Sequence, residues 1–113
     1  MIKIYHNPRC RKSRETLELI QNKRMDIEII EYLKDPPTEK ELSQILDLLG
    51  IKPIELVRKG EDIYKENYKG KTYGDNEWIK ILVEHPKLIE RPIVISNGKA
   101  AIGRPPEKVL GIL

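Results

Sequence analysis

Cys10 is the only cysteine of the chain and lies among positively charged residues. No acidic residue occurs between Met1 and Glu15, and the basic side chains around the cysteine are His6, Arg9, Arg11, Lys12 and Arg14. Positive charge favours the thiolate, which is the nucleophilic form of cysteine. A fall of two units in the pKa from ~8.5 raises the ionised fraction at pH 7 from a few per cent to roughly three quarters. The sequence predicts a reactive thiolate rather than a small buried core residue.

Two polar residues near Cys10 have more than one possible role. His6 and Ser13 could each donate a hydrogen bond to the sulfur. His6 could instead only cap the end of a strand, and the Ser13 hydroxyl could bond the backbone in the first turn of a helix.

A thiolate among cations suits an anionic electrophile, so arginines elsewhere in the chain are candidates for the same site. Arg91 and Arg104 each precede a proline, which disfavours the α conformation and predicts extended backbone at both. Arg58 is a third candidate. A single arginine is most often a solvated surface residue, and spacing alone leaves all three open.

The cysteine and histidine counts exclude several site classes. One cysteine cannot form an internal disulfide, and with two histidines it is too small a set for a closed zinc site, so we expect no metal. The net charge is +3, but 18 acidic residues are spread among 21 basic ones, and nucleic-acid binding is not expected. Neither a membrane span nor a signal peptide is predicted, so we expect a cytoplasmic protein.

The residues around Cys10 predict a strand, a turn and a helix. Apolar and charged residues alternate over 1–5, Asn7-Pro8 interrupts the pattern, and residues 11–23 favour a helix. Cys10 is therefore expected at or just before a helix N-terminus, where backbone amides stabilise a thiolate. A second alternation over 27–29 completes a β-α-β unit with parallel strands.

The middle of the chain predicts a helical segment. Thr38 and Glu41 form a T-x-x-E capping box, and Gly50 supplies a stop for the helix that it opens. Further along, we expect a short helix over 51–58, a loop or broken helix over 59–74, and a helix capped by Asp75 and ended by Pro86.

The last third predicts a hairpin and a closing helix. Asn97-Gly98 separates two apolar runs and is a strong hairpin signal. Pro105 suits the first turn of a helix that contains Val109, Leu110 and Leu113. The whole order predicts an α/β, thioredoxin-like fold with a mixed four-stranded sheet. Its 113 residues fit one domain with a helical insertion at approximately 38–86.

Five segments and one motif together resemble a known family. The segments are IYHNPRCRKSRETLELI at 4–20, EYLKDPP at 31–37, LVRKGE at 56–61, HPKLIERPIVI at 85–95 and GRPPEKVLGIL at 103–113. His6, Cys10 and Arg14 form an H-x-x-x-C-x-x-x-R pattern, which is specific when joined to the later R-P-I and R-P segments. The chain resembles the glutaredoxin-coupled arsenate reductases, the ArsC family of thioredoxin-like proteins.

The resemblance implies an oxidoreductase that reduces arsenate to arsenite. Cys10 matches the nucleophile that forms a covalent thiol-arsenate adduct, and His6 matches a residue that helps to stabilise the thiolate. Arg58, Arg91 and Arg104 match three arginines that hold the oxyanion. Ser13 and Arg14 are included as candidate catalytic residues beside Cys10. Pro92 matches a proline that is cis in thioredoxin-like proteins.

The resemblance also implies the partners. Glutathione, as co-substrate, attacks the adduct, and glutaredoxin completes the reduction. The single cysteine agrees with this scheme, because a second thiol must then come from outside the chain. We expect a monomer with no tightly bound cofactor, acting on arsenate or a related oxyanion.

Two alternatives share the predicted fold. A transcriptional regulator of the Spx kind binds RNA polymerase and senses redox state through a C-x-x-C pair, but the second position here is Ser13, which leaves only a non-catalytic adaptor. The other alternative is a glutathione-dependent thiol transferase, in which the arginines would recognise carboxylates of glutathione.

Overall fold

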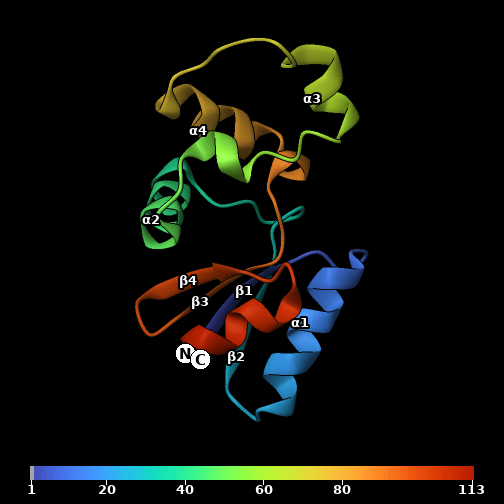
Figure 1. Ribbon diagram of the computed structural model, residues 1–113, viewed down its shortest axis with the longest axis vertical. Helices are drawn as coiled ribbons and strands as arrows, with labels where there is room; N and C mark the ends of the chain where they lie inside the picture. Colours follow the sequence, from blue (N-terminus) through green and yellow to red (C-terminus); the bar gives the residue numbers. More distant parts are fainter. Residues whose placement is uncertain (1) are drawn as a thin grey trace. The chain divides into compact units, whose positions relative to one another are not determined.

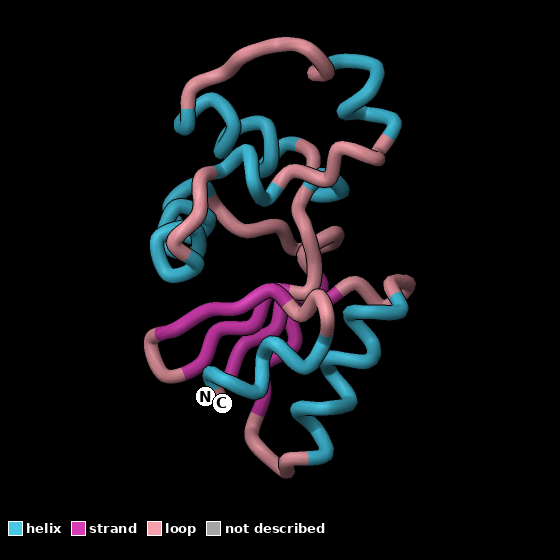
Figure 2. Tube along the Cα trace, viewed as in Figure 1, coloured by secondary structure: helices cyan, strands magenta, loops and turns pink. Residues whose placement is uncertain are grey.

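A mixed four-stranded sheet organises the first and last parts of the chain in the computed structural model, which describes residues 2–113 (Figures 1 and 2). The strands are β1 (Ile2–His6), β2 (Ile27–Glu31), β3 (Ile93–Ser96) and β4 (Lys99–Ile102). Their order in the sheet is β2-β1-β3-β4, with β1 parallel to β2 and antiparallel to β3, and β3 antiparallel to β4. The predicted parallel pair and hairpin are confirmed.

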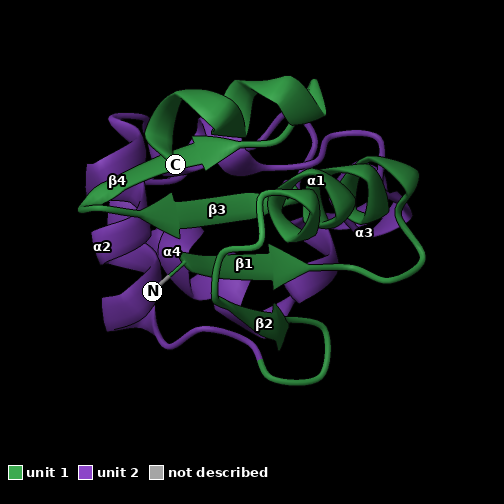
Figure 3. Ribbon diagram, turned by 90° about the horizontal axis from the view of Figure 1, so that it is seen from below, with its two compact units in different colours: residues 1–35, 91–113 green, residues 36–90 purple. Residues whose placement is uncertain are grey.

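The chain divides into two compact units (Figure 3). The first unit comprises residues 1–35 and 91–113 and holds the sheet. The second comprises residues 36–90 and contains the helical segment that the sequence placed at about 38–86.

In the first unit, two helices cover one face of the sheet (Figure 1). They are α1 (Arg11–Asn22) and the closing 3₁₀ helix η3 (Pro106–Ile112). The buried core between these helices and the sheet consists of Ile2, Ile4, Ile20, Val94 and Val109. Because Ile2 and Ile4 are two residues apart on one strand, they point to the same face, as the alternation predicted.

The two ends of the hairpin region differ in how well the sequence predicted them. Asn97 and Gly98 have φ of 54° and 72°, the positive values that a two-residue hairpin turn requires, so this turn is confirmed. The closing helix begins at Pro106, and Pro105 is its N-cap with φ −70° and ψ 163°. Placing Pro105 in the first turn was wrong, because the following Pro106 disfavours the α conformation at Pro105 and the helix begins one residue later.

The second unit is helical. It contains α2 (Glu39–Leu49), η1 (Pro53–Leu56), α3 (Asp62–Asn67), α4 (Asp75–Glu84) and η2 (Pro86–Leu88). The capping box before α2 is confirmed in both halves: Glu41 N–H donates to Thr38 Oγ1 at 3.1 Å, and Thr38 N–H donates to Glu41 Oε1 at 3.0 Å. Gly50 ends α2 in the left-handed conformation, with φ 68°.

The start of α4 corrects the prediction that Asp75 caps this helix. Gly74 is the N-cap and Asp75 is the first helical residue. Glu77 Oε1 accepts the Gly74 N–H at 3.0 Å. The glutamate at the third helical position therefore stabilises the helix start, although the N-cap glycine has no side chain to contribute. Within residues 2–113, no helix combines the length and the apolar character needed to cross a membrane.

Candidate active site

The loop between β1 and α1 places Cys10 at the start of a helix. Asn7 Oδ1 accepts the Arg9 N–H at 3.0 Å, and the Asn7 carbonyl accepts the Cys10 N–H at 3.0 Å. These two bonds form an Asx turn over residues 7–9 that lies within a β-turn over residues 7–10. Cys10 is then the N-cap of α1, with φ −92° and ψ 122°. The predicted position of the cysteine before the helix is confirmed.

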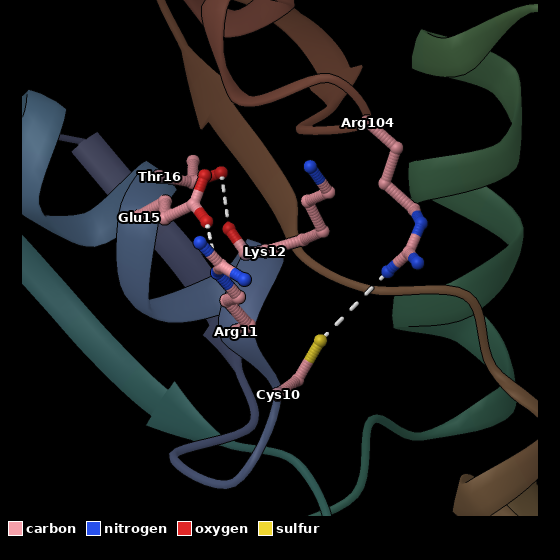
Figure 4. Close-up of polar contacts among 6 residues, drawn as sticks. All are labelled: Cys10, Arg11, Lys12, Glu15, Thr16 and Arg104. Carbon is pink, nitrogen blue, oxygen red and sulfur yellow. Dashed lines mark hydrogen bonds and ion pairs between the residues drawn. The ribbon is translucent and has the colours of Figure 1, made fainter.

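Arg104, 94 residues further along the chain, approaches the sulfur. Its Nη1 lies 3.7 Å from Cys10 Sγ and also donates to the Arg91 carbonyl oxygen at 3.0 Å. Figure 4 shows the two side chains pointing toward one another. The Arg91–Pro92 peptide bond is cis, as the family resemblance implied. The hairpin region thus brings a fixed positive charge to the helix start.

Two cations near Cys10 in sequence, Arg11 and Arg14, have other partners. Arg11 Nε is paired with Glu15 Oε1 at 3.0 Å, and Figure 4 shows its side chain turned away from the sulfur. Arg14 Nη1 donates to the Pro8 carbonyl at 3.0 Å and so spans the loop. The guanidinium groups that interact with the sulfur come from the remote residues Arg91 and Arg104 rather than from Arg11 or Arg14.

The pKa of the Cys10 thiol lies below its ordinary value. Burial alone would raise it, but the Ser13 backbone N–H and the side chains of Arg91 and Arg104 together lower it further than burial raises it. The Ser13 N–H faces the sulfur without reaching the geometry of a capping hydrogen bond. Cys10 is also only partly buried, so its thiolate is accessible to a small molecule.

The Ser13 side chain is part of a buried network in the loop. Its oxygen lies 2.7 Å from His6 Nδ1 and accepts the Asn7 N–H at 3.0 Å. Burial lowers the pKa of His6; the Glu31 carboxylate opposes this shift and Arg14 adds to it. The backbone N–H of Ser13 therefore faces the Cys10 sulfur, and the Ser13 hydroxyl faces the His6 ring.

Arg58 lies in the second unit and is engaged there. Its Nη1 is 2.8 Å from Glu90 Oε1, and its backbone N–H donates to the Leu88 carbonyl at 2.7 Å. An antiparallel bridge between Val57 and Ile89 flanks the pair. In the first unit, by contrast, the structure brings Cys10, Arg91 and Arg104 together.

Sequence reasoning missed two residues in the packing beneath this site. Thr16 on α1 and Gly103 before Arg104 are buried against one another, and Thr16 Oγ1 lies 3.4 Å from the Gly103 carbonyl oxygen. They are 87 positions apart, and no local pattern relates them. Among residues 2–113, no three potential metal-ligating side chains come together.

Comparisons with known proteins match nearly the whole chain. The model of the ArsC family matches residues 5–112. The uncharacterized protein YfgD of Escherichia coli K12 is 48% identical over 99% of this chain and 96% of its own length. An arsenate reductase of Neisseria meningitidis is 42% identical, with 99% of this chain and 97% of its own covered. The structure of an arsenate reductase from Vibrio cholerae superposes with a TM-score of 0.93 at 46% identity, covering 99% and 97% of the two chains. The predicted thioredoxin-like fold is thereby confirmed.

Proposed function

The chain belongs to the ArsC family, and from this premise we propose that it is an oxidoreductase that reduces arsenate to arsenite, with Cys10 as the nucleophile. The observation that carries the proposal is the contact between Cys10 Sγ and Arg104 Nη1, at 3.7 Å. The contact pairs an ionisable, accessible sulfur with a donor that suits a tetrahedral oxyanion.

The first step follows from the charges. The Cys10 thiolate attacks arsenic, an oxygen of arsenate leaves as hydroxide or water, and a sulfur–arsenic bond forms. Guanidinium groups offset the negative charge that accumulates on the remaining oxygens. Arg91 and Arg104 interact with the sulfur, and the family resemblance adds Arg58 as a third donor.

The second step needs thiols from outside the chain, because Cys10 is the only cysteine. One external thiol, glutathione in our proposal, forms a mixed disulfide with the Cys10 sulfur. Arsenic takes up the two electrons and leaves as arsenite. A second thiol, supplied by glutaredoxin, takes the glutathione from the mixed disulfide and returns Cys10 to the thiolate.

The proposal is tested by arsenate-dependent turnover with glutathione and glutaredoxin. We expect turnover by the wild type and only the background rate from Cys10→Ser, whereas Ser43→Ala, on α2, should resemble the wild type. Equal rates for the wild type and Cys10→Ser would reject the reductase. Cys10-dependent activity on a small disulfide without arsenate would favour the thiol transferase. Absence of both activities would leave a binding protein such as an adaptor.

A further inference from the structure

Gly103 sits where the backbone approaches α1 too closely for any side chain. A Cβ added at Gly103 would overlap the Thr16 hydroxyl, and it would lie 2.8 Å from Pro92 Cγ and 3.0 Å from Thr16 Cγ2. Two of these three atoms belong to the helix and the third to a proline ring, and both residues are buried. Any residue with a Cβ at position 103 would therefore clash with its neighbours, so glycine is required there.

Hydrogen bonds hold Gly103 in this position. Its N–H donates to the Pro92 carbonyl at 2.9 Å, and its carbonyl oxygen lies 3.4 Å from Thr16 Oγ1. The Thr16 hydroxyl donates over a shorter distance, 2.8 Å, to the Lys12 carbonyl one turn earlier on α1 (Figure 4). The contact thus joins the segment after β4 to the first turns of the helix.

The same two elements carry the reacting groups of the proposed site. Cys10 caps α1 six residues before Thr16, which is about 9 Å along a helix axis. Arg104 directly follows Gly103, and its Nη1 reaches both the Arg91 carbonyl and Cys10 Sγ. The contact of Gly103 with Thr16 therefore connects the helix that follows Cys10 to the segment that carries Arg104.

We propose that Gly103 and Thr16 are positioning residues for the nucleophile, and that the close contact of the Gly103 backbone with the Thr16 side chain sets how near the Arg104 guanidinium comes to the Cys10 sulfur. This inference rests on the proposed function only in taking Cys10 as the nucleophile. Its test follows the titration of the thiol and needs no arsenate, so failure of the reductase and failure of this inference can be told apart.

The test compares two glycine substitutions in the same unit. Gly103→Ala pushes the segment away from α1, whereas Gly111→Ala, in η3, meets no atom within 4 Å. The rate of Cys10 alkylation by iodoacetamide is measured against pH, and folding is checked by circular dichroism. The inflection of this rate profile reports the pKa of Cys10. We expect the inflection to lie at higher pH in Gly103→Ala than in the wild type, and to be unchanged in Gly111→Ala. Each unit of upward movement lowers the rate about tenfold at a pH below both inflections.

A double-mutant cycle separates positioning from general damage. If Gly103 acts through Arg104, then Arg104→Ala already raises the inflection, and adding Gly103→Ala moves it no further. The proposal is overturned if Gly103→Ala folds and titrates like the wild type, or if its shift is equally large in the Arg104→Ala background.

Substitution of Thr16 keeps the proposal testable if Gly103→Ala does not fold. Thr16→Val replaces the hydroxyl near the Gly103 carbonyl with a methyl group, whereas Thr16→Ser retains the hydroxyl. We expect an upward shift of the inflection in Thr16→Val, smaller than that in Arg104→Ala, and a return toward the wild-type value in Thr16→Ser. Equal inflections in the two variants would contradict the proposal.

Discussion

His6 Nδ1 lies 2.7 Å from the Ser13 hydroxyl oxygen, which also accepts the backbone N–H of Asn7 at 3.0 Å. Burial lowers the pKa of His6, which favours the neutral ring. In the tautomer with its proton on Nε2, the ring accepts the Ser13 hydroxyl hydrogen at Nδ1. The histidine and the serine together stabilise the loop that leads to Cys10.

The first prediction concerns stability against pH. Because the pKa of His6 is lower in the folded state, the unfolded state binds more protons between that value and ~6.5. The stabilisation that the neutral His6 ring contributes is thus present above pH ~6.5, and it is lost as the pH falls toward the pKa of His6 in the folded state. Urea unfolding should show the wild type exceeding His6→Gln in stability at pH 7.5, with a smaller difference at pH 5.5. A stability difference between the wild type and His6→Gln that stays constant or grows on acidification would contradict this prediction. His85→Gln, which removes an imidazole ring elsewhere, is the control.

The second prediction concerns the Ser13 hydroxyl. Ser13→Ala leaves the Asn7 N–H and the His6 ring without this partner in a buried setting, which costs about 1–3 kcal/mol. The backbone N–H that faces the sulfur is retained, so the inflection of Cys10 should move less than in Arg104→Ala. Urea unfolding and alkylation against pH measure the two effects. Ser43→Ala, at a half-buried serine of α2, is the control and should change stability by less than about 0.5 kcal/mol. A stable Ser13→Ala protein would show that the network contributes little.

The third prediction concerns the two arginines near the sulfur. The pKa of Cys10, which burial raises, is lowered overall by the Ser13 N–H and by both guanidinium groups. Arg91→Ala and Arg104→Ala should each raise the inflection of alkylation and weaken binding of arsenate or sulfate. Lys59→Ala should do neither, since it removes a cation from an exposed position. Equal losses of affinity in all three variants would indicate general electrostatic attraction and no specific site.

Local signals predicted most of the elements that build the loop and its surroundings. Asn7-Pro8 and the helix-forming run after it placed Cys10 at a helix start, and Asn97-Gly98 predicted the hairpin that leads to Arg104. Each of these signals acts over a few residues, where backbone preferences decide the conformation. The prediction from local signals was wrong at Asp75. The N-cap of α4 is Gly74, one residue earlier, because Glu77 at the third helical position bonds the Gly74 backbone.

The assembly around the sulfur could not be predicted in the same way. The sequence indicated a cationic setting from the neighbours of Cys10, yet Arg11 is paired with Glu15 and Arg104 supplies the contact. That contact depends on the close packing of Gly103 on Thr16, which is a property of the tertiary structure. Spacing along the chain carries no information on such a pair.

The last prediction concerns the ion pair of Arg58 and Glu90. Their Nη1 and Oε1 atoms are 2.8 Å apart, and the two side chains are 23% and 28% exposed. A carboxylate at this distance competes with an external anion for the guanidinium group. Glu90→Gln should therefore lower the KM for arsenate if Arg58 is the third oxyanion ligand, and it should cost at most about 1 kcal/mol of stability.

The control for this change is Glu84→Gln, at the end of α4, which removes an equal charge elsewhere. A gain seen in Glu90→Gln, absent in Glu84→Gln and abolished by adding Arg58→Ala would assign the effect to the Arg58 guanidinium. An unchanged KM in Glu90→Gln, or an equal change in both glutamate variants, would remove Arg58 from the set of oxyanion ligands. The proposed site would then depend on Arg91 and Arg104, because these are the guanidinium groups that lower the pKa of Cys10 against the opposing effect of its burial.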